Sequence, residues 1–300
     1  MVTKNGNRSK MAHHHMEEKL GAVFFIAIGV FVLELVGGLL SHSLALLSDS
    51  FHIMLDFVAV GVSIFAFRIA RKPHSLQLSF GFHRAEIIAA FINGILLVAV
   101  SILIFYEVYT RFFNPTPVNS HLVIIFATVG LGANVIMAHL LRKDSKSNLN
   151  VKGSYVHVIG DLVSTVGVIA GGVAMYFIPN PSIDLLISIG IGGMIIRSGI
   201  ILCRECLHIF MEGTPREIKI NEILEELGSL DEVVEVHDLH VWSITSNMLA
   251  MSVHIKIKDE FANKRKMLLD KINKTMDEKF GIDHCTIQIE DEHDLINPHK

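Results

Sequence analysis

The sequence is short of charge and of cysteine. Asp, Glu, Lys and Arg make up 19% of its 300 residues, against about 25% in soluble domains, and apolar residues make up 51%. So apolar a composition excludes a fully soluble protein and excludes disorder along most of the chain. Three cysteines exclude a disulfide scaffold. Lys and Arg form no surplus and no run, so nothing supports nucleic-acid binding.

The charge that is present is distributed unevenly. Residues 213–300 carry 11 Lys and Arg against 18 Asp and Glu, whereas residues 1–212 carry 15 against 12. An apolar first part and a charged last part predict a membrane domain followed by a soluble one. The polar segment 1–19 is expected to be an N-terminal cytoplasmic tail, not a cleavable signal peptide. We therefore predict a tail over 1–19, a membrane domain over 20–212 and a soluble domain over 213–300.

Six segments are long and apolar enough to cross a bilayer as helices, which takes about 20 residues each. They are Leu20–Leu40, Leu44–Ala70, Ala85–Phe112, His121–Leu141, Tyr155–Ile178 and Ile183–Phe210. The tail and the second and fourth linkers carry several Lys and Arg each, while the other linkers carry Arg111 at most. Basic linkers remain in the cytoplasm, so both termini are expected to be cytoplasmic in a multi-pass protein of the cell membrane.

After Gly213 the pattern becomes that of a soluble domain. Helical periodicity over 218–230 and 261–280 predicts two helices, and alternation of apolar and polar residues over 233–245, 248–258 and 286–290 predicts three strands. The fold class is therefore an α-helical membrane protein with six transmembrane helices, followed by a small α+β domain of ferredoxin-like type.

Two of the predicted spans contain the same polar motif, His-x-x-x-Asp. The second span carries His52 and Asp56, and the fifth carries His157 and Asp161. Residues four apart lie on one face of a helix, so two facing helices would present two imidazoles and two carboxylates. Zn²⁺ accepts such a tetrahedral N/O set, whereas Ca²⁺ and Mg²⁺ prefer more ligands and oxygen alone. Because ionisable groups are costly inside a bilayer, a metal or proton site is favoured over simple His–Asp hydrogen bonds.

Asp49 lies three residues before His52, on the same side of the helix. Three roles are open to it: a fifth ligand, a proton relay, or a polar group that supports the site or lines its aqueous mouth. The last is favoured.

The sequence resembles the cation diffusion facilitator family, and most closely its bacterial zinc/cadmium/cobalt exporters. The resemblance extends over about residues 20–290. It rests on Ser43–Asp49 with His52 and Asp56, on Phe80–Glu86, on Asn148–Asn150 with His157 and Asp161, on Glu212–Pro215 and on His237–Ser243.

The resemblance implies a homodimer whose subunits each export a divalent metal by exchange for protons. It implies that His52, Asp56, His157 and Asp161 form the transport site. Members with two His and two Asp are similar to a zinc-selective group that often carries cadmium, and some Gram-positive relatives are thought to use potassium as well. A basic residue at the position of Arg84 pairs in relatives with an acid near the position of Glu212, which would lock the hinge of the dimer.

A second candidate metal site lies in the soluble domain. Its candidates are His237, His240, His254, His284, Glu290 and Glu292. His237 and His254 fall on strands that we expect to pair as a hairpin, where alternate residues share one face. The resemblance implies a cytoplasmic zinc site at His237, His254 and Glu290, which would stabilise the dimer or sense metal.

Two other functions compete with metal export. One is a membrane cytochrome with His52 and His157 as axial haem ligands, although that would leave Asp56 and Asp161 unexplained. The other is a metal sensor without transport, although a sensor needs no site inside the membrane. The chain is not expected to be an enzyme, because no nucleophile–base arrangement or phosphate-binding loop is apparent.

Overall fold

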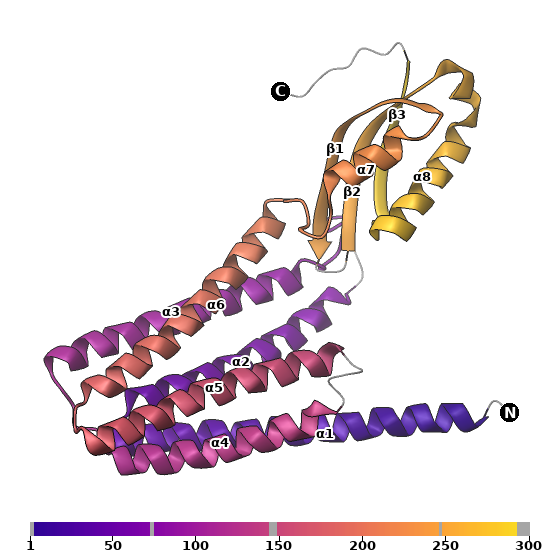
Figure 1. Ribbon diagram of the computed structural model, residues 1–300. Coiled ribbons are helices and arrows are strands. Elements are labelled where there is room, and N and C mark those ends of the chain that lie inside the picture. Colours follow the sequence, from indigo (N-terminus) through magenta and orange to yellow (C-terminus); the bar gives the residue numbers. More distant parts are fainter. Residues whose placement is uncertain (1–2, 73–74, 144–148, 246–247, 293–300) are drawn as a thin grey trace. The chain divides into compact units, whose positions relative to one another are not determined.

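A computed structural model describes residues 3–72, 75–143, 149–245 and 248–292, with side chains described from Gly21 and, in the fifth helix, from Val151. Six long helices come first: α1 (Thr3–Ser41), α2 (Leu44–Ala70), α3 (Ala85–Phe113), α4 (Ser120–Arg142), α5 (Leu149–Phe177) and α6 (Ser182–Phe210). All six contain an apolar stretch that is long enough to span a membrane, which agrees with the prediction (Figure 1). Residues 3–19 of the predicted tail are helical and belong to α1; residues 1–2 and the side chains of 3–20 lie outside the described part.

The chain divides into two compact units. The first comprises residues 1–60 and 93–200, and the second comprises residues 61–92 and 201–300. In the first unit α4 packs against both α1 and α5, as Figure 1 shows. One apolar cluster joins α1, α2, α4 and α5 through Val30, Ile53, Met137 and Val158.

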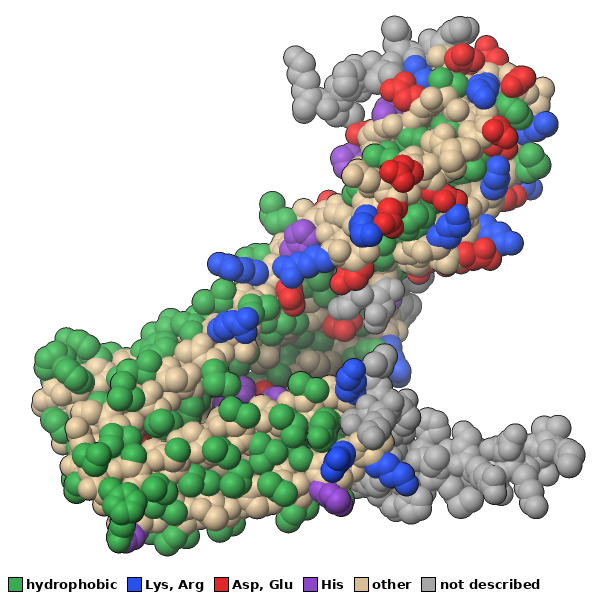
Figure 2. Space-filling model, viewed as in Figure 1, with side chains coloured by type: hydrophobic (Ala, Val, Ile, Leu, Met, Phe, Trp, Pro, Cys, Tyr) green, Lys and Arg blue, Asp and Glu red, His purple; other side chains and the backbone are tan. Residues whose placement is uncertain are grey.

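The outward surface of the long helices is apolar. Phe25, Leu103, Val163 and Leu186 are each more than 60% exposed. Figure 2 shows hydrophobic side chains over the long helices and charged side chains over the C-terminal domain. A surface with so many exposed apolar side chains is typical of helices that face lipid.

Helix α2 is anchored at its first turn by a carboxylate from α6. Asp184 is 1% exposed, and its two oxygens accept hydrogen bonds from Ser43 Oγ at 2.6 Å and from the backbone N–H of Leu44 at 2.6 Å. A carboxylate at a helix N-terminus satisfies free N–H groups and complements the helix dipole. The turn before it is held by Arg111, whose Nη1 donates to the carbonyl of His42 at 2.6 Å. The start of the helix that carries His52 and Asp56 is thereby fixed.

The C-terminal domain is formed by α7 (Ile220–Gly228), β1 (Val233–Thr245), β2 (Met248–Ile257), a 3₁₀ helix (Asp259–Lys264), α8 (Arg265–Phe280) and β3 (His284–Asp291). The sheet order is β1-β2-β3, with β1 and β2 antiparallel and β2 and β3 parallel. Helix α8 ends where Gly281 adopts φ 65°, a left-handed conformation that glycine tolerates best. The three predicted strands are confirmed.

One face of this sheet is buried and the other is open. Alternate residues of β2, namely Met251, Val253, Ile255 and Ile257, are at most 1% exposed and pack in one core with Ile223 of α7 and with Leu268, Ile272 and Met276 of α8. Side chains alternate along a strand, so His254 points to the opposite, open face. The sheet therefore presents polar groups on the side that the helices leave free.

Candidate metal sites

Helices α2 and α5 bring the two His-x-x-x-Asp motifs together. His157 Nε2 lies 3.1 Å from Asp56 Oδ2 on the other helix and 3.8 Å from Asp161 Oδ2 on its own. The His52 ring completes the group, its centroid 6.0 Å from that of His157. In addition, His52 Nδ1 is buried without a hydrogen-bond partner among the described residues. Two imidazoles and two carboxylates thus meet on facing helices.

Three of these four side chains line a cavity of about 230 Å³. Asp56, His157 and Asp161 form part of its wall, together with apolar side chains of α1 and α2. His157 remains 47% exposed and Asp161 14% exposed. The ligand set is therefore reachable by an ion and is enclosed on several sides by apolar residues, a surrounding that strengthens electrostatic interactions.

Asp49 of α2 contacts two hydroxyl groups of α5. Its Oδ1 lies 2.7 Å from Ser164 Oγ and its Oδ2 lies 3.3 Å from Thr165 Oγ1. Both hydroxyls also lie within 2.9 Å of the Asp161 carbonyl. Asp49 is 2% exposed, so its carboxylate is occupied in joining α2 to α5 one turn beyond Asp161. This geometry favours a supporting role over that of a fifth ligand. The sequence analysis did not single out Ser164 and Thr165, which only the helix pairing reveals.

The haem hypothesis does not suit this geometry. A porphyrin would have to lie flat between the two imidazoles. The carboxylates of Asp56 and Asp161 lie within 3.8 Å of His157 Nε2, in the space that the ring would need.

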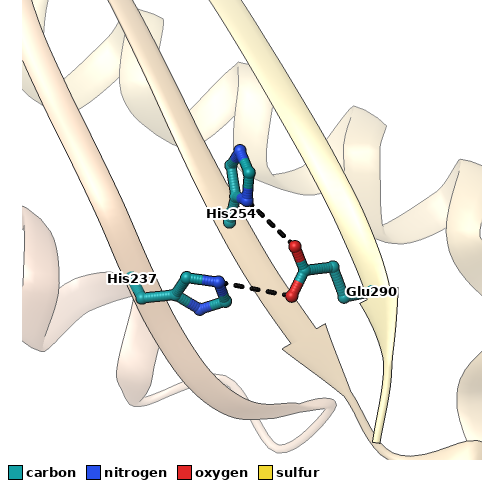
Figure 3. A group of neighbouring side chains, drawn as sticks. All are labelled: His237, His254 and Glu290. Carbon is teal, nitrogen blue, oxygen red and sulfur yellow. Dashed lines mark hydrogen bonds and ion pairs between the residues drawn. The ribbon is translucent and has the colours of Figure 1, made fainter. Parts of the chain in front are cut away.

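A second cluster lies on the open face of the C-terminal sheet. His237 of β1, His254 of β2 and Glu290 of β3 point toward one another (Figure 3). His254 Nδ1 lies 2.9 Å from Glu290 Oε1, and His237 Nε2 lies 3.3 Å from Glu290 Oε2. One ligand atom from each of the three lies within 4.8 Å of the others. The predicted hairpin is confirmed, because His237 and His254 are register partners across it.

The donor set of this cluster suits zinc. His237 Nδ1 and Glu290 Oε2 are buried and have no hydrogen-bond partner among the described residues, so the cluster is incompletely satisfied as it stands. Two imidazoles and a carboxylate are ligands that Zn²⁺ takes in tetrahedral sites.

Asp238 is a neighbour that the sequence analysis missed. Its Oδ2 lies 3.7 Å from His254 Nε2, and its Oδ1 lies 3.0 Å from His240 Nε2. Strict alternation would turn Asp238 away from the face of His237. The pairing register shifts between His237 and His240, and Asp238 adopts φ 51°. A bulge of this kind turns a side chain to the other face of the sheet. The bulge can be recognised only from the pairing register of the two strands.

His284 and Glu292 are not members of this three-residue cluster, and neither is Cys285, which follows His284 in β3. His284 is exposed and its ring packs edge-on against Phe80. Burial and the nearby carboxylates of Asp283 and Asp277 raise the pKa of the Cys285 thiol to about 11. A thiol with that pKa is protonated at neutral pH and is a poor metal ligand. Glu292 has no ion pair in the part of the chain that the structure describes.

Arg84 and Glu212 lie side by side, as the sequence analysis expects. Arg84 Nη2 lies 3.3 Å from Glu212 Oε1, with the two side chains 39% and 63% exposed. An ion pair this exposed contributes about 0–1 kcal/mol to stability. The pair therefore contributes little to the free energy of folding.

Comparison with known proteins agrees with both parts of the structure. Residues 20–211 match the cation efflux transmembrane domain, and residues 215–292 match the cytoplasmic domain of cation efflux proteins. The chain is 37% identical over 289 residues to the cadmium, cobalt and zinc/H(+)-K(+) antiporter of Bacillus subtilis, covering 94% of this chain and 93% of that protein. It is 36% identical over 263 residues to the metal cation efflux system protein CzcD of Cupriavidus metallidurans, covering 87% and 83%. It is 32% identical over 293 residues to the zinc transporter ZitB of Escherichia coli, covering 93% of each. The family matches span both the helical domain and the C-terminal domain, and the chain therefore belongs to the cation efflux family.

Proposed function

We propose that this protein exports Zn²⁺, and with it Cd²⁺ or Co²⁺, from the cytoplasm in exchange for protons. The observation that carries the proposal is the contact between α2 and α5, where His157 Nε2 meets Asp56 Oδ2 at 3.1 Å inside two apolar spans. His52, Asp56, His157 and Asp161 are the proposed ligands of the transported ion. The names of the relatives, which are transporters of cadmium, cobalt and zinc, support this substrate class.

The chemistry of the four side chains supports exchange for protons. Imidazole and carboxylate bind a metal only when deprotonated, so binding of the metal releases protons. A histidine that faces water titrates near neutral pH. Metal arriving from the cytoplasm would displace protons, and protons arriving from outside would displace the metal. Asp49 would hold α5 in position beside the ligands through Ser164 and Thr165.

The proposed topology places both termini in the cytoplasm. The basic linkers that follow α2 and α4 would lie on the same side as the C-terminal domain. The C-terminal domain would pair with its copy in a homodimer, in keeping with the cytoplasmic domain family that it matches. The Arg84–Glu212 pair would hold the hinge of that dimer.

We further propose a resident zinc ion at His237, His254 and Glu290, with Asp238 as a neighbouring carboxylate. Replacement of His237 by Ala removes one of two nitrogen ligands. We expect the full-length protein to lose about one bound zinc per chain, since a three-donor site rarely survives the loss of a ligand. Zinc flux through the transport site is expected to persist. The zinc content after dialysis tests the expected loss of bound zinc. Zinc flux in proteoliposomes tests whether transport persists.

The matched control is His284→Ala, which removes an exposed histidine of the same domain. It is expected to keep the full zinc content. Equal zinc content in wild type, His237→Ala and His284→Ala would contradict a metal site in this cluster.

The transport proposal is tested by zinc-dependent proton movement in proteoliposomes. We expect zinc uptake to drive protons in the opposite direction, and an imposed proton gradient to drive zinc uphill. Zinc binding without any flux would contradict transport and would favour a sensor.

A further inference from the structure

One carboxyl group of the long helices is buried and unsatisfied. Glu34 of α1 is 0% exposed, and neither of its side-chain oxygens has a hydrogen-bond partner among the described residues. The other buried acids differ, since Asp184 accepts backbone N–H groups and Asp49 lies against two hydroxyls. A buried carboxylate with no donor is strongly disfavoured in its charged form.

Glu34 occupies space that α4 leaves free. A Cβ atom at Gly130 would lie 2.8 Å from Glu34 Oε1, so the missing side chain at that position makes room for the carboxyl group. Between His121 and His139, helix α4 carries no ionisable residue that would supply a positive charge. The ionisable groups that act on Glu34 are Asp49 of α2 and Asp161 of α5, and both are acids.

Two features connect Glu34 to the proposed transport site. The first is electrostatic, because the charge of Asp161, a proposed metal ligand, acts on Glu34. The second is a chain of polar groups that begins one helical turn away from Gly130, without a hydrogen bond to Glu34 itself. Asn134 lies one turn beyond Gly130 on the same face of α4, and its Nδ2 donates to Thr165 Oγ1 at 3.3 Å. Thr165 Oγ1 lies in turn 3.3 Å from Asp49 Oδ2.

We infer that Glu34 is a proton-binding site of the exchange cycle, separate from the four metal ligands and coupled to them through the electric field. With no metal bound, the charged groups that act on Glu34 among the described residues are acids, and a proton neutralises Glu34. When a divalent cation binds beside Asp161, its two positive charges favour the ionised form of Glu34. The proton then leaves Glu34 as the metal arrives, and it returns when the metal departs.

This inference rests on the proposed function, yet its test does not require transport. Glu34→Gln keeps the shape of the side chain and removes the titrating group. Protons released per zinc bound are measured on the full-length protein in detergent, by calorimetry in buffers of different ionisation enthalpy. We expect Glu34→Gln to release up to about one proton fewer than wild type, and the pH dependence of its zinc affinity to be flatter by up to about tenfold per pH unit.

A matched control and a second measurement sharpen the result. Glu86→Gln removes an exposed acid of α3 and is expected to release as many protons as wild type. Infrared difference spectra of wild type are expected to lose the carbonyl band of a protonated carboxylic acid when zinc is added, and that change is expected to be missing in Glu34→Gln.

Three outcomes would overturn the inference. One is an unchanged number of protons in Glu34→Gln, and another is an infrared difference that does not depend on Glu34. The third concerns potassium. If the zinc affinity of wild type depends on potassium, if that dependence disappears in Glu34→Gln, and if proton release is unchanged, the Glu34 carboxylate binds an alkali cation instead of a proton. Failure of wild type to move zinc in proteoliposomes would instead contradict the proposed function and leave this binding result standing.

Discussion

Replacement of Asp161 by Ala is expected to abolish zinc flux. Asp161 is largely buried, its carboxylate lies 3.8 Å from His157 Nε2, and its backbone carbonyl lies within 2.9 Å of Ser164 and Thr165. The substitution leaves those backbone contacts in place and removes only the ligand. Loss of a residue that merely orients a metal ligand already costs about 10–100-fold in affinity, so loss of a ligand is expected to cost at least about 100-fold. Initial zinc uptake in proteoliposomes measures the effect.

Two further variants separate a lost ligand from a damaged fold. His157→Ala is expected to be as inactive as Asp161→Ala, whereas His139→Ala removes an exposed histidine of α4 and is expected to transport like wild type. Gel filtration and thermal unfolding are expected to be unchanged in all three. Retained flux in both Asp161→Ala and His157→Ala would contradict the shared site between α2 and α5.

Exchange of His52 for Asp is expected to change which metal the protein carries. The site would then have one nitrogen and three carboxylate ligands. Imidazole suits Zn²⁺, whereas carboxylates suit harder ions such as Mn²⁺. The ratio of zinc to manganese transport is therefore expected to fall by about 10–100-fold, the range in which changes around a metal alter affinity. Competition between the two metals, measured in the same proteoliposomes, reports this ratio directly.

The control for His52→Asp is His52→Ala, which removes the nitrogen without supplying an oxygen. It is expected to lose zinc transport and to gain no manganese transport. His121→Asp, in the first turn of α4, is expected to change neither rate. If His52→Asp discriminates against Mn²⁺ as strongly as wild type, ligand type is not what selects the metal.

The proposed transport site and the C-terminal cluster differ in how they are constructed. The first joins two helices that belong to separate stretches of the chain, so a small movement of α5 against α2 would open or close it. The second joins three adjacent strands of one sheet, whose hydrogen bonds fix the distances between His237, His254 and Glu290. Transport needs a site that opens and closes, whereas a rigid site suits an ion that stays.

Apolar length and strand alternation predicted the elements well, because each is a local property of the chain. The predicted segment 44–70 is helix α2, and 233–245 is strand β1. The predictions were less accurate where polar residues continue a helix beyond its apolar stretch. Helix α5 begins at Leu149, not at Tyr155, since hydropathy detects the part that lipid covers and not the whole helix.

The sequence also left several polar residues unexplained. Glu34 is a lone acid in an apolar span, a pattern that the cost of intramembrane charge would have flagged. Asp184 lies near the start of α6, so the sequence pattern is that of a residue at the membrane–water interface. Asp238 was missed because strict alternation along β1 would place it on the face opposite His237. The bulge, which the sequence pattern does not reveal, changes that orientation.

The sequence by itself determined the six spans, the α/β C-terminal domain and the two His-x-x-x-Asp motifs, because periodicity and residue spacing along one helix or strand fix each of these. Only the tertiary structure decided which groups meet. It paired His157 with Asp56 across two helices, turned Asp49 toward Ser164 and Thr165, and left Glu34 buried against Gly130 with no hydrogen-bond donor among the described residues. Such contacts depend on how one helix is rotated and shifted against another. That relation is set by packing over the whole bundle, and no local stretch of sequence encodes it.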